Sequence, residues 1–96
     1  RLAFWRQGTL ALLALAPLGI TVNNIAPGAI ETPINARLMN DPALKKPLLA
    51  RIPQGRLGKP ADVAGVAAFL ASDDADYVTA TTTVVDGGLL WNYAEQ

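Results

Sequence analysis

The stretch Ile20-Thr-Val-Asn-Asn-Ile-Ala-Pro-Gly-Ala-Ile-Glu-Thr32 decides the fold of this chain. Its first half is rich in β-branched residues, which predicts a strand over Ile20–Ile25. Pro27 and Gly28 then interrupt the strand, because proline has no N–H for the ladder and glycine adopts backbone angles closed to other residues. In open α/β sheets, ligands bind where such a strand ends and a loop begins. A plain strand-to-loop corner without a ligand is the alternative interpretation.

Composition restricts the class of protein. The 96 residues suffice for one domain, and the 51% hydrophobic content favours a packed core over a disordered chain. Eight basic residues balance eight acidic ones without a basic cluster, which argues against a nucleic-acid partner. The chain has no cysteine, which is compatible with the reducing cytoplasm, and we predict a cytoplasmic protein.

The chain also contains no histidine. This excludes Ser-His-Asp and Cys-His catalysis within it and, together with the lack of cysteine, the usual zinc sites. We predict no metal site. Any chemistry must come from carboxylates, Lys, Tyr, Ser or Thr, or from a bound cofactor.

The apolar run that precedes the deciding stretch has two interpretations. Alanine and leucine over Thr9–Ala16 favour the last turns of a buried helix, and Pro17 with Gly19 supplies its end. A basic start followed by a short apolar run is also typical of a secretory signal, but this run is too short to span a bilayer. We favour the helix and expect no membrane partner.

The region 33–58 lacks a clear period and contains several prolines. Short helices are predicted near Ile34–Met39 and Ala43–Ile52. Irregular regions of this kind are often lids or binding loops, although a surface excursion without function fits equally well.

The last third of the chain predicts a helix and a second strand. Pro60 and Asp62 suit the start of a helix over Pro60–Ala71, whose side chains are apolar or small nearly all round, so we expect it to be covered on more than one side. Thr81–Val85 is predicted as a strand, and Asp86-Gly-Gly88 as a turn. The large apolar residues of Leu89–Tyr93 are expected to dock rather than fray. Strand, helix and strand in this order predict a parallel crossover, as in one end of a doubly wound sheet.

Several segments together resemble one family. They are Val22-Asn-Asn-Ile-Ala-Pro-Gly-Ala-Ile-Glu-Thr32, Gly55-Arg-Leu-Gly-Lys-Pro-Ala-Asp-Val-Ala64, Phe69-Leu-Ala-Ser-Asp73, Tyr77-Val-Thr79 and Val84-Val-Asp-Gly-Gly88. In this order they resemble the C-terminal part of a short-chain dehydrogenase/reductase, with wording closest to the glucose 1-dehydrogenase-like group. The resemblance covers Thr9 to the C-terminus.

The resemblance implies a Rossmann-type fold and NAD- or NADP-dependent interconversion of alcohols and carbonyl compounds, on sugar or 3-oxoacyl substrates. It places the nicotinamide end of the cofactor against Pro27, Gly28, Ile30 and Thr32, where the Ile30 backbone meets the carboxamide and the Thr32 hydroxyl meets the carboxamide or a phosphate. Residues 33–56 correspond to a mobile substrate loop. A homo-oligomer is implied through 60–71 and 81–85, and we expect the apolar tail 89–93 to join the same contact.

The departures from the family shape the functional prediction. No glycine-rich phosphate loop, active-site Asn and Ser or Tyr-x-x-x-Lys pair occurs in this sequence, so it offers no catalytic residue. Residues 1–8 are atypical, and Ala80 stands where the family usually has glycine. We therefore predict that 1–96 form a single truncated C-terminal segment, incomplete as a sheet and inactive alone. A non-catalytic, self-associating module is the alternative. A cofactor-free hydrolase using Ser72 with Asp73 and Asp74 is less favoured.

Overall fold

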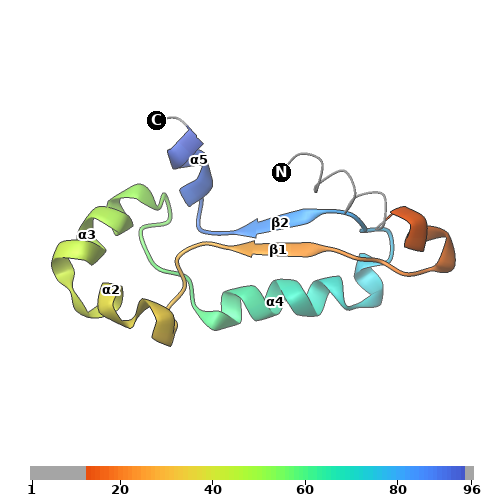
Figure 1. Ribbon diagram of the computed structural model, residues 1–96, viewed down its shortest axis with the longest axis horizontal. Helices are drawn as coiled ribbons and strands as arrows, with labels where there is room; N and C mark the ends of the chain where they lie inside the picture. The colour runs from red at the N-terminus through yellow and green to blue at the C-terminus, as the bar shows by residue number, and fades with distance from the viewer. Residues whose placement is uncertain (1–12, 95–96) are drawn as a thin grey trace.

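Two strands, β1 (Asn24–Pro27) and β2 (Thr82–Val85), pair in parallel at the centre of the computed structural model, which describes residues 13–94 (Figure 1). Their register places Asn24 opposite Thr82 and Pro27 opposite Val85. The helix α4 (Pro60–Leu70) connects them and runs along the sheet. This is the predicted strand–helix–strand crossover, and the α/β fold class is confirmed.

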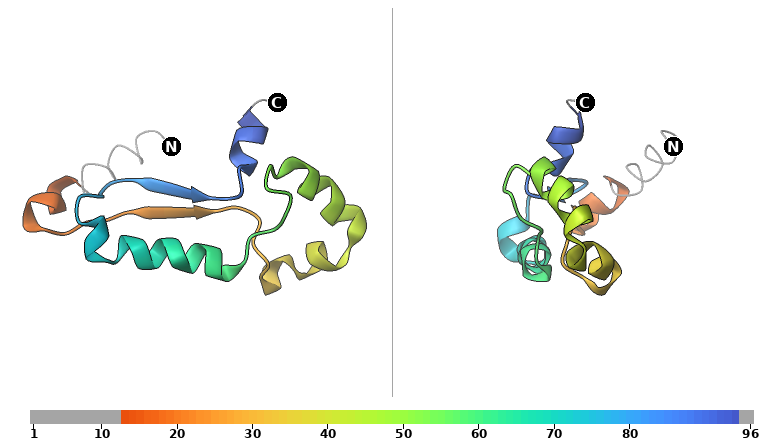
Figure 2. Two further views of the ribbon diagram at one scale, coloured as in Figure 1. Left: turned by 180° about the vertical axis from the view of Figure 1, so that it is seen from behind. Right: turned by 90° about the vertical axis from the view of Figure 1, so that its left-hand side faces the viewer.

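The remaining elements lie at the two ends of the sheet. Beyond the carboxyl ends of the strands lie α2 (Ala36–Asn40), α3 (Pro42–Arg51) and α5 (Leu89–Ala94) (Figures 1 and 2). Three short 3-10 turns complete the described elements, over Ala16–Leu18, Pro33–Asn35 and Asp73–Ala75. The described chain is therefore elongated, with principal extents of 50 × 29 × 22 Å.

The predicted strand over Ile20–Ile25 was placed too early. Its first half does not join the ladder, because Val22 exchanges bonds with a loop instead: its N–H donates to the Thr79 hydroxyl at 3.2 Å and its carbonyl accepts from the Ala80 N–H at 2.9 Å. Regular pairing begins only at Asn24, whose N–H donates to the Thr81 carbonyl. β-Branching alone could not separate these two kinds of pairing.

Pro27, which was expected to break the strand, is its last residue. The N–H groups of Asn24 and Gly28 donate to β2, at the Thr81 and Val85 carbonyls, each at 2.9 Å. Because alternate residues of a strand face opposite edges, the missing N–H of Pro27 falls on the edge away from β2. The proline therefore costs no bond of this ladder.

The helix predictions hold within one or two residues. The α4 helix ends one residue before the predicted Ala71. Helices α2 and α3 correspond to the two short helices predicted in 33–58. Gly19, at φ 77°, ends the 3-10 turn that follows Leu13–Leu15, as expected of a helix stop. The remainder of the predicted Thr9–Ala16 helix lies outside the described residues.

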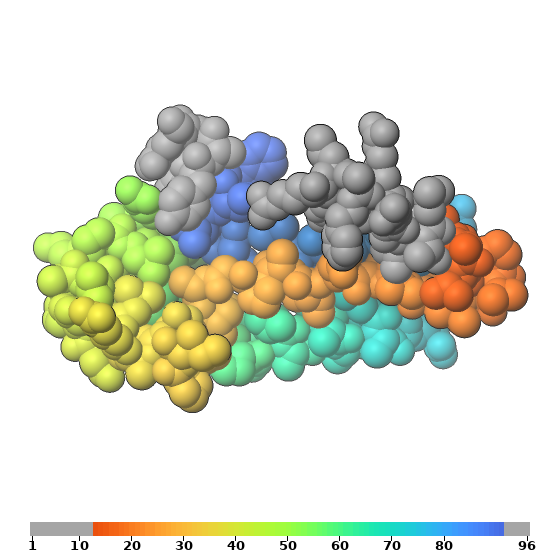
Figure 3. Space-filling model, in the orientation of Figure 1, coloured from red at the N-terminus to blue at the C-terminus, as the bar shows by residue number. Residues whose placement is uncertain are grey.

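The core of the described chain is small. Only Ile30, Ile52, Leu57 and Ala75 are buried among its hydrophobic residues. No residue of α4 is buried, and the Phe69 side chain is 47% exposed. Figure 3 shows α4 open to solvent along the edge of the molecule below β1. The expected covering of this apolar helix on more than one side is not supplied by the described residues.

The C-terminal segment forms a helix that packs only in part. As predicted, Gly87 and Gly88 turn the chain with positive φ, of 66° and 96°. The Asp86 carboxylate accepts from the N–H groups of Gly88 and Leu90, at 2.9 and 2.8 Å, and so begins α5. Helix α5 contacts α3, but Trp91 remains 76% exposed. The expected docking of Leu89–Tyr93 is therefore incomplete within this chain. Among residues 13–94, no helix has the length and apolar character needed to cross a membrane.

Candidate functional site

The predicted cofactor residues lie in one turn of chain at the carboxyl end of β1, which we call the corner (residues 27–32). Gly28 is its second residue, and the need for glycine there comes from packing. A Cβ atom on Gly28 would lie 2.5 Å from the Asp86 Cβ, at the end of the neighbouring strand. Gly28 therefore lets the two strands end side by side, and this contact accounts for the glycine without a ligand.

A backbone bridge to Gly58 holds the middle of the corner. The Gly58 N–H donates to the Ala29 carbonyl at 2.9 Å, and the Glu31 N–H donates to the Gly58 carbonyl at 2.8 Å. Between them, Ile30 is 7% exposed, and a Cβ on Gly58 would lie 2.5 Å from its Cδ1 atom. The segment before α4 thus fixes the corner from one side.

The polar groups of the corner that have no hydrogen-bond partner among the described residues include the Ile30 N–H, which faces away from the Gly58 bridge, and the hydroxyl of the half-buried Thr32. Thr32 precedes the 3-10 turn Pro33–Asn35 but does not cap it with its side chain. The Ile30 carbonyl, in contrast, accepts from the side-chain amide of Asn35, with Nδ2 and O 2.6 Å apart. The corner can therefore offer the Ile30 N–H and the Thr32 hydroxyl to a ligand.

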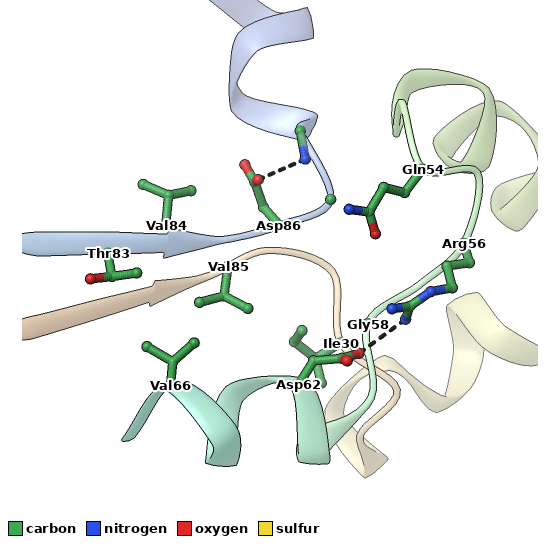
Figure 4. A pocket seen from close by; sticks show the side chains of 12 residues that line it. Ile30, Gln54, Arg56, Gly58, Asp62, Val66, Thr83, Val84, Val85 and Asp86 are labelled. Atoms are coloured by element: carbon green, nitrogen blue, oxygen red, sulfur yellow. Dashed lines mark hydrogen bonds and ion pairs between the residues drawn. The ribbon is translucent and has the colours of Figure 1, made fainter. Parts of the chain in front are cut away.

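Ile30 also lines a separate pocket of about 440 Å³, which lies between α4 and the end of β2 (Figure 4). It is open to solvent and lined by the end of β2 with the turn 86–88, the first two turns of α4 and the segment 54–58. Of the four predicted cofactor residues, only Ile30 lines it. Sequence reasoning did not anticipate this pocket, because its wall is built from three segments that only the fold brings together.

An ion pair forms one wall of the pocket. Arg56 Nη1 lies 3.0 Å from the Asp62 carboxylate and also donates to the Leu57 carbonyl at 3.0 Å. The Lys59 N–H donates to the same carboxylate oxygen at 2.7 Å, as in the return bond of a capping box. The Arg56 hydrogen bond, with this backbone bond second, holds the pKa of Asp62 below its ordinary value. The same hydrogen bond raises the pKa of Arg56. The pair thus joins the segment before α4 to its first turn.

Two other kinds of site were considered from the sequence. Among the described residues, no group of acidic side chains is placed to hold a metal ion. The Ser72 hydroxyl, the nucleophile of the hydrolase alternative, donates to the Phe69 carbonyl at 2.6 Å at the end of α4. No hydrogen bond joins Ser72 to Asp73 or Asp74 in the described chain, and Ser72 has the contacts of a helix-end residue.

A family model described as enoyl-(acyl carrier protein) reductase matches residues 9–90 of the chain. This match spans the corner, the segment 33–58, α4 and β2. The chain belongs to the short-chain dehydrogenase/reductase family.

Curated relatives agree with this assignment. A 3beta-hydroxysteroid dehydrogenase of Eggerthella lenta is 56% identical over 81 residues, which are 84% of this chain and 31% of that protein. An L-rhamnose 1-dehydrogenase (NAD(P)+) of Azotobacter vinelandii is 48% identical over 80 residues, or 83% of this chain and 31% of that protein. The chain thus spans about a third of the length of the curated relatives that it matches.

Solved structures of the family share the arrangement of these elements. A gluconate 5-dehydrogenase from Burkholderia cenocepacia, in complex with NADP and tartrate, superposes with a TM-score of 0.81 at 38% identity, covering 93% of this chain and 35% of that one. A short-chain type dehydrogenase/reductase from Mycobacterium ulcerans gives 0.84 at 35% identity, covering 93% and 32%. The two-stranded sheet with its crossover helix is therefore part of a Rossmann-like sheet.

Proposed function

We propose that this chain is the part of an NAD(P)-dependent alcohol–carbonyl oxidoreductase that holds the nicotinamide end of the cofactor. The observation that carries the proposal is the corner itself, where the Ile30 N–H and, two residues later, the Thr32 hydroxyl are both unpaired at the carboxyl end of a parallel strand. This is where open α/β sheets bind their ligands. The printed names of relatives that use NAD(P)+ or hold NADP support it.

The groups of the corner fit one end of the cofactor only. An N–H donor and a hydroxyl suit the carboxamide of a nicotinamide, whereas a dinucleotide also needs a helix N-terminus with a glycine-rich loop for its pyrophosphate. Pro27 and Gly28 shape the corner, while Ile30 and Thr32 supply the donors. When bound, the cofactor would supply hydride transfer, and these residues would orient its ring.

The 96 residues alone are proposed to be inactive. Proton transfer in this family is expected from a Tyr-x-x-x-Lys pair, and Tyr77 is followed four positions later by Thr81. Isolated chain mixed with NADPH and a ketose is expected to show no loss of absorbance of the reduced nicotinamide. Turnover would contradict the proposal of inactivity, and isothermal titration giving micromolar NADPH affinity would contradict the expected weak binding.

Saturation-transfer NMR with NADPH tests the corner. Saturation is expected to reach the nicotinamide ring protons and to spare the adenine protons, because only the nicotinamide end meets the chain. Thr32→Val should lower this transfer, since it removes the hydroxyl. Thr82→Val, at an exposed position of β2, is the matched control and should leave it unchanged. Equal transfer to both ends of the cofactor, or no effect of Thr32→Val, would reject the proposed role of the corner.

A polyhydroxylated, sugar-type carbonyl compound is the substrate class that we favour, as in the glucose 1-dehydrogenase-like group. Support comes from the names of relatives, which include L-rhamnose 1-dehydrogenases and a gluconate 5-dehydrogenase. The helices α2 and α3, which contact each other and follow the corner directly, would form the substrate loop. A 3-oxoacyl substrate is the alternative, supported by the description of the family model. Competition of each compound class for the NADPH-bound corner in the same NMR experiment distinguishes them.

A second candidate function, self-association, is supported by the exposed apolar surface of the chain. We propose that it pairs with a second copy through 60–71, 81–85 and 89–93. Phe69 on α4, Val84 on β2 and Trp91 on α5 are all exposed, and the outer edge of β2 pairs with no described strand. An open edge of this kind favours pairing with another chain. Sedimentation should show a dimer or larger species that dissociates on Phe69→Glu, and a stable wild-type monomer would reject the pairing.

A further inference from the structure

Asn35 makes two hydrogen bonds back to the corner. Its side-chain amide donates to the Ile30 carbonyl, with Nδ2 and O 2.6 Å apart, and its N–H donates to the Thr32 carbonyl at 2.9 Å. Together these bonds close a short loop of chain around Thr32. The Asn35 side chain is half-buried, so the bond to Ile30 is partly shielded from water.

No other hydrogen bond in the described chain holds the carbonyls of Ile30 and Thr32. The bridge to Gly58 uses the peptide groups of Ala29 and Glu31, and in a parallel pair those of the intervening Ile30 face the opposite way. The Thr32 side chain makes no hydrogen bond to the turn that it precedes. The Ile30 carbonyl shares a planar peptide group with the Glu31 N–H, so the Gly58 bridge and the Asn35 side chain hold this one group from opposite sides. Loss of the Asn35 bond leaves the group held from one side only.

Asn35 also belongs to the next element of the chain. It is the last residue of the 3-10 turn Pro33–Asn35 and the N-cap residue of α2, with φ −97° and ψ 14°. Helix α2 in turn packs on α3. One side chain therefore joins the corner to the helix pair that follows it.

We infer that Asn35 is a positioning residue, whose bond to the Ile30 carbonyl fixes the corner in the geometry that presents the Ile30 N–H and the Thr32 hydroxyl to a ligand. The value of this geometry for a nicotinamide rests on the function proposed above. The hydrogen bond and its effect on the corner do not, so the two can be tested separately.

Asn35→Asp is the decisive variant. At pH 7 its carboxylate has no proton to donate, so an acceptor faces the Ile30 carbonyl, whereas near the ordinary aspartate pKa of about 3.9 the protonated carboxyl regains a donor. Asn40→Asp is the matched control, because Asn40 ends the same helix α2, is exposed and has no described side-chain partner. Both variants add the same charge.

Hydrogen exchange of the Glu31 amide measures how stably the corner is held in the protein without ligand. This N–H is bonded to Gly58, so its protection reports whether the corner stays in place. Asn35→Asp should lower the protection about tenfold at pH 7, the effect of about one lost hydrogen bond. The loss should shrink as the pH approaches 3.5, while Asn40→Asp should match the wild type throughout. Equal protection in the two variants at pH 7, or a loss without pH dependence, would overturn the inference.

Titration with reduced nicotinamide mononucleotide, followed at the Ile30 and Thr32 amides by NMR, reads the ligand. The dissociation constant should rise several-fold in Asn35→Asp and stay unchanged in Asn40→Asp. The wild-type chain could fail to bind this nucleotide while the protection of the Glu31 amide still falls in Asn35→Asp. That result would reject the proposed function and support the positioning role of Asn35. The Val85 amide signal shows whether Asn35→Asp stays folded. If it unfolds, Asn35→Ala takes its place, because it removes the donor without adding a charge. Unchanged protection of the Glu31 amide in Asn35→Ala would overturn the inference.

Discussion

The side-chain carbonyl of Asn23 accepts two hydrogen bonds from Thr81, from its N–H at 3.1 Å and from its hydroxyl at 2.8 Å. The amide group of the same Asn23 donates to the Val78 carbonyl at 2.9 Å. Between these anchors lies Ala80, at φ 61°, the one non-glycine residue with positive φ in the described chain. Asn23 therefore holds in place a loop that contains a strained alanine, immediately before β2.

Ala80→Gly is expected to raise the free energy of unfolding by about 1 kcal/mol. The left-handed conformation costs an L-residue about 1–2 kcal/mol, and the greater freedom of glycine in the unfolded chain offsets part of the gain. Urea denaturation followed by circular dichroism measures the difference. The sequence already indicated this position, because the family usually has glycine there.

Ala64→Gly provides the control for that change. Ala64 is exposed in the middle of α4, where glycine should lower the free energy of unfolding by about 1 kcal/mol. The same substitution is thus expected to act with opposite signs at two positions. A loss of stability in both variants would show that the Ala80 conformation carries no strain.

Asn23→Ala is expected to lower the free energy of unfolding by about 2 kcal/mol, because it leaves the part-buried Val78 carbonyl and the exposed Thr81 N–H without their partner. The neighbouring Asn24 has an exposed side chain with no described hydrogen bond, so Asn24→Ala should change it by less than about 0.5 kcal/mol. Thermal melts of the two variants test this difference. Equal melting temperatures would contradict the anchoring role of Asn23.

The ion pair at the start of α4 should make stability depend on pH. The Arg56 hydrogen bond, then the Lys59 N–H, lower the pKa of Asp62, so this carboxylate stabilises the fold above its unfolded-state pKa of about 3.9. The contribution is lost as the pH falls through the lowered folded-state pKa. The wild type should therefore exceed Asp62→Asn in urea midpoint at pH 7, and the gap should close below about pH 4.

Asp74→Asn serves as the control for the pH series, because Asp74 is exposed and has no described ion pair. It removes one negative charge and leaves the Arg56–Asp62 ion pair intact. Its urea midpoint should follow that of the wild type at every pH. A gap between wild type and Asp62→Asn that persists unchanged down to pH 3 would assign the effect of Asp62→Asn to packing rather than charge.

Local sequence patterns predicted the helices and strands of this fold, but they did not predict the contacts between segments far apart in the sequence. Proline at Pro60 and β-branching at Thr82–Val85 act within a few residues, so α4 and β2 were found nearly to the residue. The start of β1 was missed because Val22 bonds to a loop far along the chain, which no local pattern encodes. Within the candidate site, the corner was indicated by Pro27 and Gly28.

The residues that support the corner were not predicted for the same reason. Gly58 reaches it only after the chain has folded back. Asn35 is near in sequence, but asparagine after a proline is common in turns, so its type alone did not reveal the bond to Ile30. The signal that could have suggested the role of Asn35 is its position, since it is a polar residue close in sequence to the predicted ligand-binding corner.

Gly28→Ala tests whether the corner is packed as described. The added Cβ would lie 2.5 Å from the Asp86 Cβ and 2.9 Å from its Cα, and because the Cα belongs to the backbone, the two strand ends would have to separate. We expect the free energy of unfolding to fall by about 1–3 kcal/mol, as for other overpacked sites.

Gly65→Ala is the matched change for this prediction. A Cβ on Gly65 would meet nothing within 4 Å, and alanine should stabilise the exposed helix α4 by about 1 kcal/mol. Chemical denaturation at low protein concentration compares the two, since pairing of copies through α4 would bring a second chain against Gly65. Stability that rises with Gly28→Ala as well would mean that the strands do not end side by side at Gly28 and Asp86, and the corner would then lack the support on which its geometry depends.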